Sequence, residues 1–420
     1  KSSAGLSLLF LMSTRPGIVE ACLQDQCSLE YEEVNSLVLQ FLESMDGNQL
    51  SEGVISPAFY AQCSVLQENV EYLKLCRLGP NASSYQIHVF QLNFDDAIED
   101  IDTIGDEEIT TSQQWMLPVR SLDGLWDSLI YEANLKEKLL QYVCTSLQLS
   151  SCGVNSNIIT WNRVVLLHGP PGTGKTSLCK ALAQKIAIRF ATRFSSIHLV
   201  EINAHSLFSK WFSESGKLVM KLFSRIKMLL EDEDSFVCIL IDEVESLAGA
   251  RTSAMSGSDP SDAIRVVNAL LTQIDQLKNF SNILILTTSN ITGAIDLAFV
   301  DRADIKQFIG PPSPEAIYEI LSSCILELSR ANVIIGQCTL LNYHWLEQMK
   351  EMEDEPIQAS LVLAEIAKKC EGFSGRKLRK LPFLALALEV SETPCSLPVF
   401  LEALRCAVEQ ERESLQSLDK

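Results

Sequence analysis

Basic residues and histidine are scarce in this chain. Its 420 residues include 34 Lys and Arg against 54 Asp and Glu, for a net charge of −20, and only 5 His. Nucleic-acid binding depends on Lys and Arg that neutralise phosphates, so we expect no direct nucleic-acid binding. The histidines show no ligand spacing, which argues against a zinc site. The acidic balance favours a protein partner instead.

Long apolar runs and paired cysteines are missing too. No uncharged apolar run reaches the roughly 18 residues of a membrane span, so we expect no membrane contact. Residues 5–12 are apolar but lack a small-residue cleavage pattern, so we expect no secretory signal. Because Met12 is followed by Ser13 and Thr14, we interpret residues 1–11 as upstream of the fold. The 13 cysteines contain no C-x-x-C pair and are predicted to be reduced, as in an intracellular protein.

What the sequence does contain is a buried strand followed by a glycine-rich loop and a helix. The apolar residues 164–167 predict the strand, and residues 177–188 have helical spacing. The loop between them matches G-x-x-x-x-G-K-T, the pattern of a phosphate-binding loop. Its residues are Gly169, Pro170, Pro171, Gly172, Thr173, Gly174, Lys175 and Thr176. A simple turn would need only one or two of these residues.

Each residue type in the loop has a chemical reason. Glycines let backbone N–H groups turn toward phosphate oxygens, and the N-terminus of the following helix adds its positive dipole end. Lys175 is then placed to reach the β- and γ-phosphates of a nucleotide. Thr176 offers a hydroxyl to Mg²⁺, which prefers oxygen ligands.

Two further buried strands end in polar residues. Residues 236–241 are apolar throughout and lead into Asp242 and Glu243. Beside a phosphate loop, the first carboxylate is predicted to hold Mg²⁺ and the second to polarise water; capping of the next helix is the weaker alternative. The strand predicted at 282–290 ends at Asn290, which the carboxyl edge of a parallel sheet would present to the phosphates.

The alternation of strands and helices predicts an α/β fold with a doubly wound parallel sheet. Another strand is predicted at 198–203 and an amphipathic helix at 263–277. After residue 311 we expect helices only, a helical lid at the C-terminus. Its predicted helices cover residues 315–328, 361–370, 375–390 and 399–415.

The N-terminal part has a different pattern. A short helix around 37–42 and an alternating strand at 85–92 predict a small α+β domain that serves interaction. The following stretch, 95–108, has many acidic residues and no basic one, and we interpret it as a solvated linker.

Two aromatic positions remain open on the sequence alone. Trp126, upstream of the phosphate loop, either packs beside an adenine ring or belongs to the core. The triplet Lys210, Trp211 and Phe212 opens a predicted helix and is as compatible with a core position as with a functional one.

Together, the phosphate loop, the strand ending in Asp-Glu, the strand ending in Thr287-Thr288-Ser289-Asn290 and the lid resemble the AAA+ ATPase module. Within it, the chain is similar to the pachytene checkpoint AAA+ ATPase family, which remodels HORMA-domain proteins. The stretches that carry this similarity are ITWNRVVLLHG (159–169), HSLFSKWFSESGK (205–217), PSDAIRVVNA (260–269), FVDRADIK (299–306) and SGRKLRKLP (374–382).

The resemblance implies a role for each matching residue. Lys175 and Thr176 would bind ATP and Mg²⁺, and Asp242 would hold the metal. Glu243 would activate water, and Asn290 would sense the γ-phosphate. The remaining roles are a lid arginine at Arg376, with Arg379 as its alternative, an arginine finger at Arg302, and a substrate pore loop at Lys210, Trp211 and Phe212. The finger segment departs from common usage, since it has one arginine where many relatives have two.

The resemblance also implies a homohexamer that acts on HORMA-domain proteins, directly or through an adaptor. It would work in meiotic synapsis and recombination and in the spindle checkpoint, on chromosomes in the nucleus and also in the cytoplasm. We expect an N-terminal recognition domain at 1–94, an acidic linker at 95–113, a large ATPase domain at 114–310 and the lid at 311–420. The alternatives are an unfolding or severing ATPase with other clients and an ATP-gated scaffold.

Overall fold

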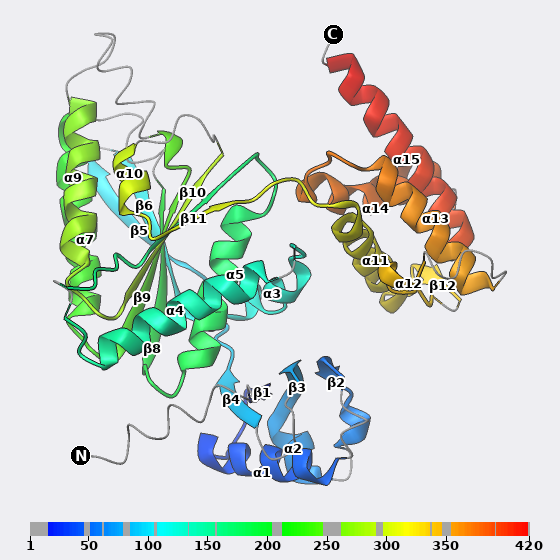
Figure 1. Ribbon diagram of the computed structural model, residues 1–420, viewed down its shortest axis with the longest axis horizontal. Helices are drawn as coiled ribbons and strands as arrows, with labels where there is room; N and C mark the ends of the chain where they lie inside the picture. The colour runs from blue at the N-terminus through cyan, green and yellow to red at the C-terminus, as the bar shows by residue number, and fades with distance from the viewer. Residues whose placement is uncertain are drawn as a thin grey trace. The chain divides into compact units, whose positions relative to one another are not determined.

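The computed structural model describes most of the chain (Figure 1). The described residues are 16–45, 51–60, 63–78, 85–104, 107–132, 134–155, 158–203, 212–246, 262–290, 297–336, 338–346, 354–390 and 392–418. They form two compact units, one of Lys1–Asp123, Ala183–Glu201 and Lys221–Ile239, and one of Gly124–Leu182, Ile202–Met220 and Leu240–Lys420. Within the described ranges, no helix is both long and apolar enough to cross a bilayer.

The N-terminal segment forms a four-stranded sheet with strand order β2-β3-β1-β4. Its elements are β1 (Gly17–Leu23), α1 (Tyr31–Ser44), β2 (Gly53–Ile55), the 3₁₀ turn η3 (Pro57–Phe59), α2 (Ser64–Asn69), β3 (Val70–Arg77) and β4 (Tyr85–Gln91). Helix α1 buries Val34, Val38 and Leu42, which recur every four residues and so share one face. That face joins the same hydrophobic core as Val19 and Leu73 of the sheet. The prediction of a small α+β domain is confirmed.

The predicted acidic linker is wrong where it covers residues 98–104 and 107–113. These residues belong to β5 (Ile98–Ile104) and β6 (Glu107–Leu117), an antiparallel hairpin at the end of the larger sheet. The acidic composition has another physical reason here, because β5 is an edge strand and charged side chains protect such edges from unwanted pairing. Ile98 is 68% exposed, as an edge position allows.

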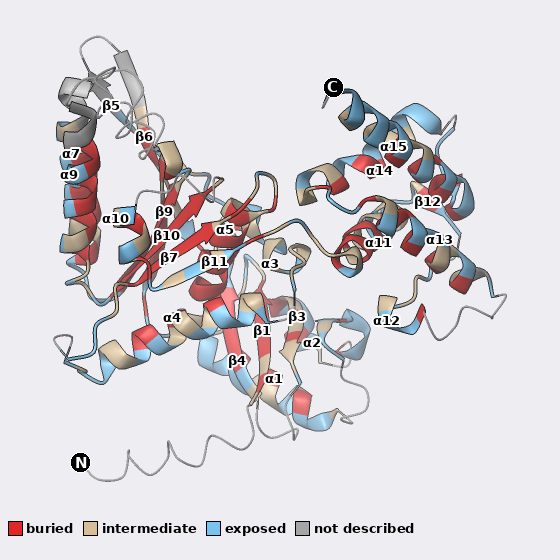
Figure 2. Cartoon of the chain, turned by 45° about the horizontal axis from the view of Figure 1, so that its top comes forward, coloured by how far each residue is buried: buried red, intermediate tan, exposed pale blue. Residues whose placement is uncertain are grey.

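The larger sheet has seven strands in the order β11-β7-β10-β9-β8-β6-β5. The strands after the hairpin are β7 (Val164–His168), β8 (Ser196–Asn203), β9 (Ser235–Asp242), β10 (Ile283–Ser289) and β11 (Ile305–Phe308). Strand β7 pairs in parallel with β10 and with β11. Figure 2 shows β9 and β10 buried, as strands covered on both faces require. The prediction of a doubly wound parallel sheet is confirmed. The antiparallel hairpin of β5 and β6 and the strand β11 also belong to this sheet and were not predicted.

Helices alternate with these strands along the chain. They are η4 (Arg120–Leu122), α3 (Leu125–Ser128), α4 (Leu135–Ser151), α5 (Lys175–Phe190), α7 (Phe212–Leu230), α9 (Asp262–Leu277) and α10 (Leu297–Arg302). Helix α5 begins at Lys175, inside the glycine-rich motif, so its N-terminal N–H groups lie at the loop.

The C-terminal part is a helical domain with its own core. Its helices are α11 (Pro314–Arg330), α12 (Tyr343–Leu346), α13 (Glu355–Lys369), α14 (Gly375–Glu389) and α15 (Leu397–Leu418). Ile317, Leu363, Leu378 and Leu404, one from each long helix, lie in that core. The lid is confirmed, but the expectation that strands stop at residue 311 is wrong. Two short strands, β12 (Ile334–Ile335) and β13 (Cys395–Ser396), pair in parallel within it.

Candidate nucleotide-binding and hydrolysis site

The glycines of the phosphate loop are required by the backbone. Gly169, Gly172 and Gly174 have φ values of 146°, 77° and 88°, which side chains other than glycine rarely adopt. A Cβ at Gly169 would lie 2.1 Å from the carbonyl oxygen of Ile309, and one at Gly174 would lie 2.6 Å from the Tyr131 hydroxyl. The loop is therefore closely enclosed by its neighbours.

Lys175 is held inside the loop. Its ammonium donates to the carbonyl oxygens of Gly169 (2.9 Å) and Pro170 (2.8 Å), and the residue is only 4% exposed. Burial lowers the pKa of Lys175, whereas the nearby carboxylates of Glu245, Asp242 and Glu243 favour its charged form. The cation thus lies where phosphate oxygens of a nucleotide would meet the loop.

Oxygen donors converge beside the start of α5. The hydroxyl of Thr176 donates to Oδ1 of Asp242 (2.9 Å), and the hydroxyl of Thr288 donates to the same oxygen. A carboxylate and a hydroxyl next to a phosphate loop are the ligands that Mg²⁺ prefers. The donor set of Thr176 and Asp242 therefore fits this metal.

The predicted water activator and sensor contact each other. The side-chain amide of Asn290 donates to Oε1 of Glu243 (3.2 Å), and the backbone N–H of Glu243 donates to the Thr288 hydroxyl (3.2 Å). Glu243 has a φ of 56°, in the left-handed region. The tertiary structure thus places two residues that are far apart in sequence next to each other, as their predicted roles require.

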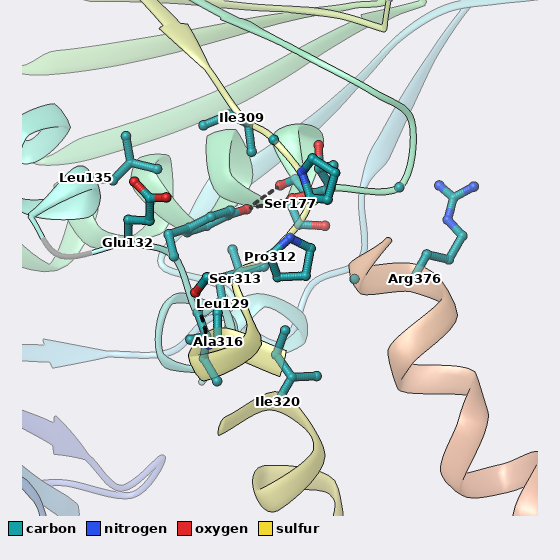
Figure 3. A pocket seen from close by; sticks show the side chains of 18 of the residues that line it. Leu129, Glu132, Leu135, Ser177, Ile309, Pro312, Ser313, Ala316, Ile320 and Arg376 are labelled. Carbon is teal, nitrogen blue, oxygen red and sulfur yellow. Dashed lines mark hydrogen bonds between the residues drawn. The ribbon is translucent and has the colours of Figure 1, made fainter. Parts of the chain in front are cut away.

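A cavity of about 600 Å³ opens beside the loop (Figure 3). Its lining includes Leu129, Ile130, Tyr131, Gly172, Thr173, Gly174, Ser177, Ile309, Pro312, Ser313, Ile320, Arg376 and Arg379. One side is the phosphate loop, and the others are apolar residues of segment 129–131 and of the chain that leads into α11. This combination fits a nucleoside triphosphate, with its base against apolar groups and its phosphates on the loop.

Of the two positions left open for Trp126, the lining of this cavity does not support the one beside the adenine. Trp126 is not part of the lining; the ammonium of Lys136 lies 5.4 Å from the centroid of its ring and donates to its carbonyl oxygen. Tyr131 lines the cavity instead, and its hydroxyl donates to the carbonyl oxygens of Thr173 (3.3 Å) and Gly174 (3.1 Å). The apolar pair Leu129 and Ile130 just before it was the available sequence signal.

Both candidate lid arginines line the cavity, but in different ways. The backbone N–H of Arg376 donates to the carbonyl oxygen of Gly172 (3.1 Å). The positive charge of Arg376 contributes to the lowered pKa of Lys175. Figure 3 shows Arg376 projecting from the first turn of α14. The guanidinium of Arg379 donates to the Ser128 carbonyl oxygen instead. The contacts favour Arg376 for the phosphate end, and its role stays a prediction.

Arg302 and the pore-loop triplet lie elsewhere. The Arg302 guanidinium is bound by both carboxylate oxygens of Asp275, at 2.9 and 2.6 Å, and this hydrogen bonding lowers the Asp275 pKa. Arg302 does not line the cavity, so within its own chain it is separate from the nucleotide site. Lys210 and Trp211 lie outside the described residues, and only the backbone of Phe212 is described.

Comparisons with known proteins agree with this geometry. Residues 165–311 match the model of the ATPase family associated with various cellular activities (AAA), and residues 313–412 match the TRIP13-like AAA+ ATPase lid C-terminal domain. The fold and site therefore define an AAA+ ATPase.

Individual relatives narrow the family. The pachytene checkpoint protein 2 homolog of Homo sapiens is 54% identical over 338 residues, which are 80% of this chain and 78% of the relative. The structure of C. elegans PCH-2 has a TM-score of 0.76 at 37% identity, covering 95% of this chain and 99% of that one. A chain of the E. coli MS115-1 HORMA:CdnC:Trip13 complex shares the fold, with a TM-score of 0.52 at 18% identity over 69% of this chain and 93% of that one. This chain belongs to the pachytene checkpoint protein 2 family of AAA+ ATPases.

Proposed function

We propose that this ATPase uses ATP hydrolysis to convert closed HORMA-domain proteins to their open form. The family to which the chain belongs supports this proposal, and so does the similarity of its fold to a chain of the bacterial complex that contains HORMA and Trip13. We further propose that it acts in meiotic chromosome synapsis and recombination and in the spindle checkpoint. We propose that it is located in the nucleus, where it associates with chromosomes, and also in the cytoplasm.

The hydrolytic step follows from the side chains of the site. Lys175 and the backbone of the loop bind the phosphates, and Arg376 approaches from the lid. Thr176 and Asp242 would hold Mg²⁺, which when bound neutralises phosphate charge. Glu243, oriented by Asn290, takes a proton from the attacking water.

The contact between Glu243 and Asn290 is the observation that carries hydrolysis rather than binding alone. A scaffold that merely binds ATP needs the phosphate loop but gains nothing from an oriented carboxylate beside it. The remaining alternative, an unfolding or severing ATPase, differs in its client. We propose that the N-terminal domain selects the client, directly or through an adaptor, in a homohexamer.

The experiment that tests the remodelling function uses Trp211, which we propose grips the client polypeptide in the central pore. The variant Trp211→Ala should keep its melting temperature and basal ATPase rate, yet fail to release the peptide bound by a closed HORMA-domain protein. It should also lose any stimulation of the ATPase by that client. A core tryptophan would instead cost about 3 to 5 kcal/mol of unfolding free energy on truncation.

Trp345 provides the matched control, because it is 55% exposed in α12 of the lid. Trp345→Ala should leave melting, ATPase and peptide release unchanged. A large loss of stability in Trp211→Ala, or full release activity, would contradict the pore-loop role. If the unmodified ATPase hydrolyses ATP but does not release the peptide from the HORMA-domain protein, the result would favour an unfolding or severing ATPase with other clients.

A further inference from the structure

Glu245 follows the end of β9 and lies two residues beyond Glu243. Its Oε1 accepts a hydrogen bond from the backbone N–H of Asn290 at 3.1 Å. Its Oε2 is buried and accepts no hydrogen bond from the described part of the chain. Neither the phosphate-loop motif nor the Asp-Glu pair assigns a function to this carboxylate.

The backbone N–H of Asn290 needs an acceptor outside the sheet. The parallel ladder between β10 and β7 ends at the pair of Ser289 and His168, so Asn290 lies one residue beyond the last paired position. The Glu245 carboxylate supplies that acceptor from the neighbouring strand end. An ionised acceptor makes a backbone hydrogen bond stronger than a neutral one does.

Two other hydrogen bonds join the same strand ends. The backbone N–H of Val244 donates to the carbonyl oxygen of Thr288 (3.0 Å), and that of Glu243 donates to the Thr288 hydroxyl (3.2 Å). The bond from Asn290 to Glu245 is the last of this series and lies closest to the sensor side chain. Through the backbone of Asn290, the Glu245 carboxylate is thus linked to the contact between the Asn290 amide and Glu243.

We propose that Glu245 is a positioning residue for ATP hydrolysis, because it holds the backbone of Asn290 and thereby keeps the Asn290 amide on Glu243. This inference rests on the roles proposed for Glu243 and Asn290. Glu243 has a left-handed backbone that costs energy in a residue other than glycine, so its orientation depends on such external contacts. Glu245 acts through Asn290.

A second effect of Glu245 has to be separated from positioning. Burial lowers the pKa of Lys175, and Glu245 is the strongest of the carboxylates that favour the charged form of that lysine. Replacement by Gln separates the two effects, since the amide oxygen of Gln still accepts a hydrogen bond but carries no charge.

The test compares Glu245→Ala and Glu245→Gln by ATPase kinetics, by equilibrium binding of ADP and by melting. Glu245→Ala should lower kcat by about 10- to 100-fold, which is the range typical of losing a residue that orients another side chain of the active site. Its Kd for ADP should change little, because the phosphate loop is intact. Glu245→Gln should retain most of the kcat. Glu365→Ala, at an exposed position of α13, is the control and should match the unmodified protein.

A double variant tests whether Glu245 acts through Asn290. Glu245→Ala combined with Asn290→Ala should have the same kcat as Asn290→Ala alone. The reason is that each substitution removes the same contact, the one between the Asn290 amide and Glu243, and it can be lost only once. An unchanged kcat in Glu245→Ala would overturn the inference, as would equal losses in the Gln and Ala variants. If only Asn290→Ala loses activity, Glu245 is not a positioning residue and the role of Asn290 stands. If Asn290→Ala keeps full activity, that proposed role fails as well.

Discussion

Glu243 combines solvent exposure with an orienting partner, as a residue that activates water requires. Glu243→Gln preserves the shape of the side chain and its contact with Asn290 but removes the proton acceptor. We expect ATP to bind with normal affinity while kcat falls by about 10²- to 10⁴-fold, the usual range for a general base. Single-turnover hydrolysis and equilibrium ATP binding measure the two effects separately.

The same substitution at an exposed carboxylate, Glu365→Gln, should leave both quantities unchanged. Near-normal hydrolysis by Glu243→Gln would show that another group takes the proton.

Helix α5 carries two buried cations in its C-terminal half. The charged groups of Lys185 and Arg189 lie 2.6 and 3.1 Å from the Glu20 carboxylate of β1. All three side chains are less than 10% exposed. Burial alone would raise the Glu20 pKa, but the two cations outweigh it and hold that pKa below its ordinary value of 4.5.

Because the folded-state pKa of Glu20 is lowered, its contribution to stability is present above the ordinary pKa and is lost as the pH falls through the lowered one. Glu20→Gln should cost about 3 to 5 kcal/mol of unfolding free energy at pH 7, since it leaves two buried cations without their anion. The cost should shrink in melts at progressively lower pH below 4.5.

The exposed pair of Glu327 and Arg330 provides the control for Glu20, and Glu327→Gln should not change the melt. A cost for Glu20→Gln that stays constant down to about pH 3 would contradict the charge-pair explanation.

At the scale of the whole molecule, Arg302 belongs to the proposed hexamer rather than to one chain. Its guanidinium does not line the cavity of its own subunit, which fits a group offered to a neighbour. Within its own chain the guanidinium pairs with Asp275. Arg302→Ala should bind ATP normally but hydrolyse it about 10³- to 10⁵-fold more slowly, the effect of losing an arginine supplied in trans. Lys175→Ala should lose ATP binding itself.

Mixing the two inactive variants should restore part of the activity, because a sound loop can then face a sound arginine. Native mass spectrometry would establish that mixed rings form. Mixed rings without recovered activity would contradict the trans role, whereas a lower melting temperature for Arg302→Ala alone would indicate that its pair with Asp275 is structural.

The local sequence determined the parts of this protein whose signals lie within one short segment. The motif 169–176 needs its glycines for backbone angles, and continuous apolar residues predict the strands that end at Asp242 and just before Asn290. The helical lid follows from helical periodicity. These features depend on neighbours within a few positions of the chain, so a pattern is enough to predict them.

Only the tertiary structure decided which distant residues meet. The acidic stretch forms an edge hairpin because strand pairing, which composition does not encode, gives its backbone a partner. Tyr131 rather than Trp126 lines the cavity, and Glu245 reaches the backbone of Asn290, because the packing of separate segments sets these contacts. Side-chain direction and chain crossing are properties of the folded arrangement, and for that reason the sequence alone could not predict them.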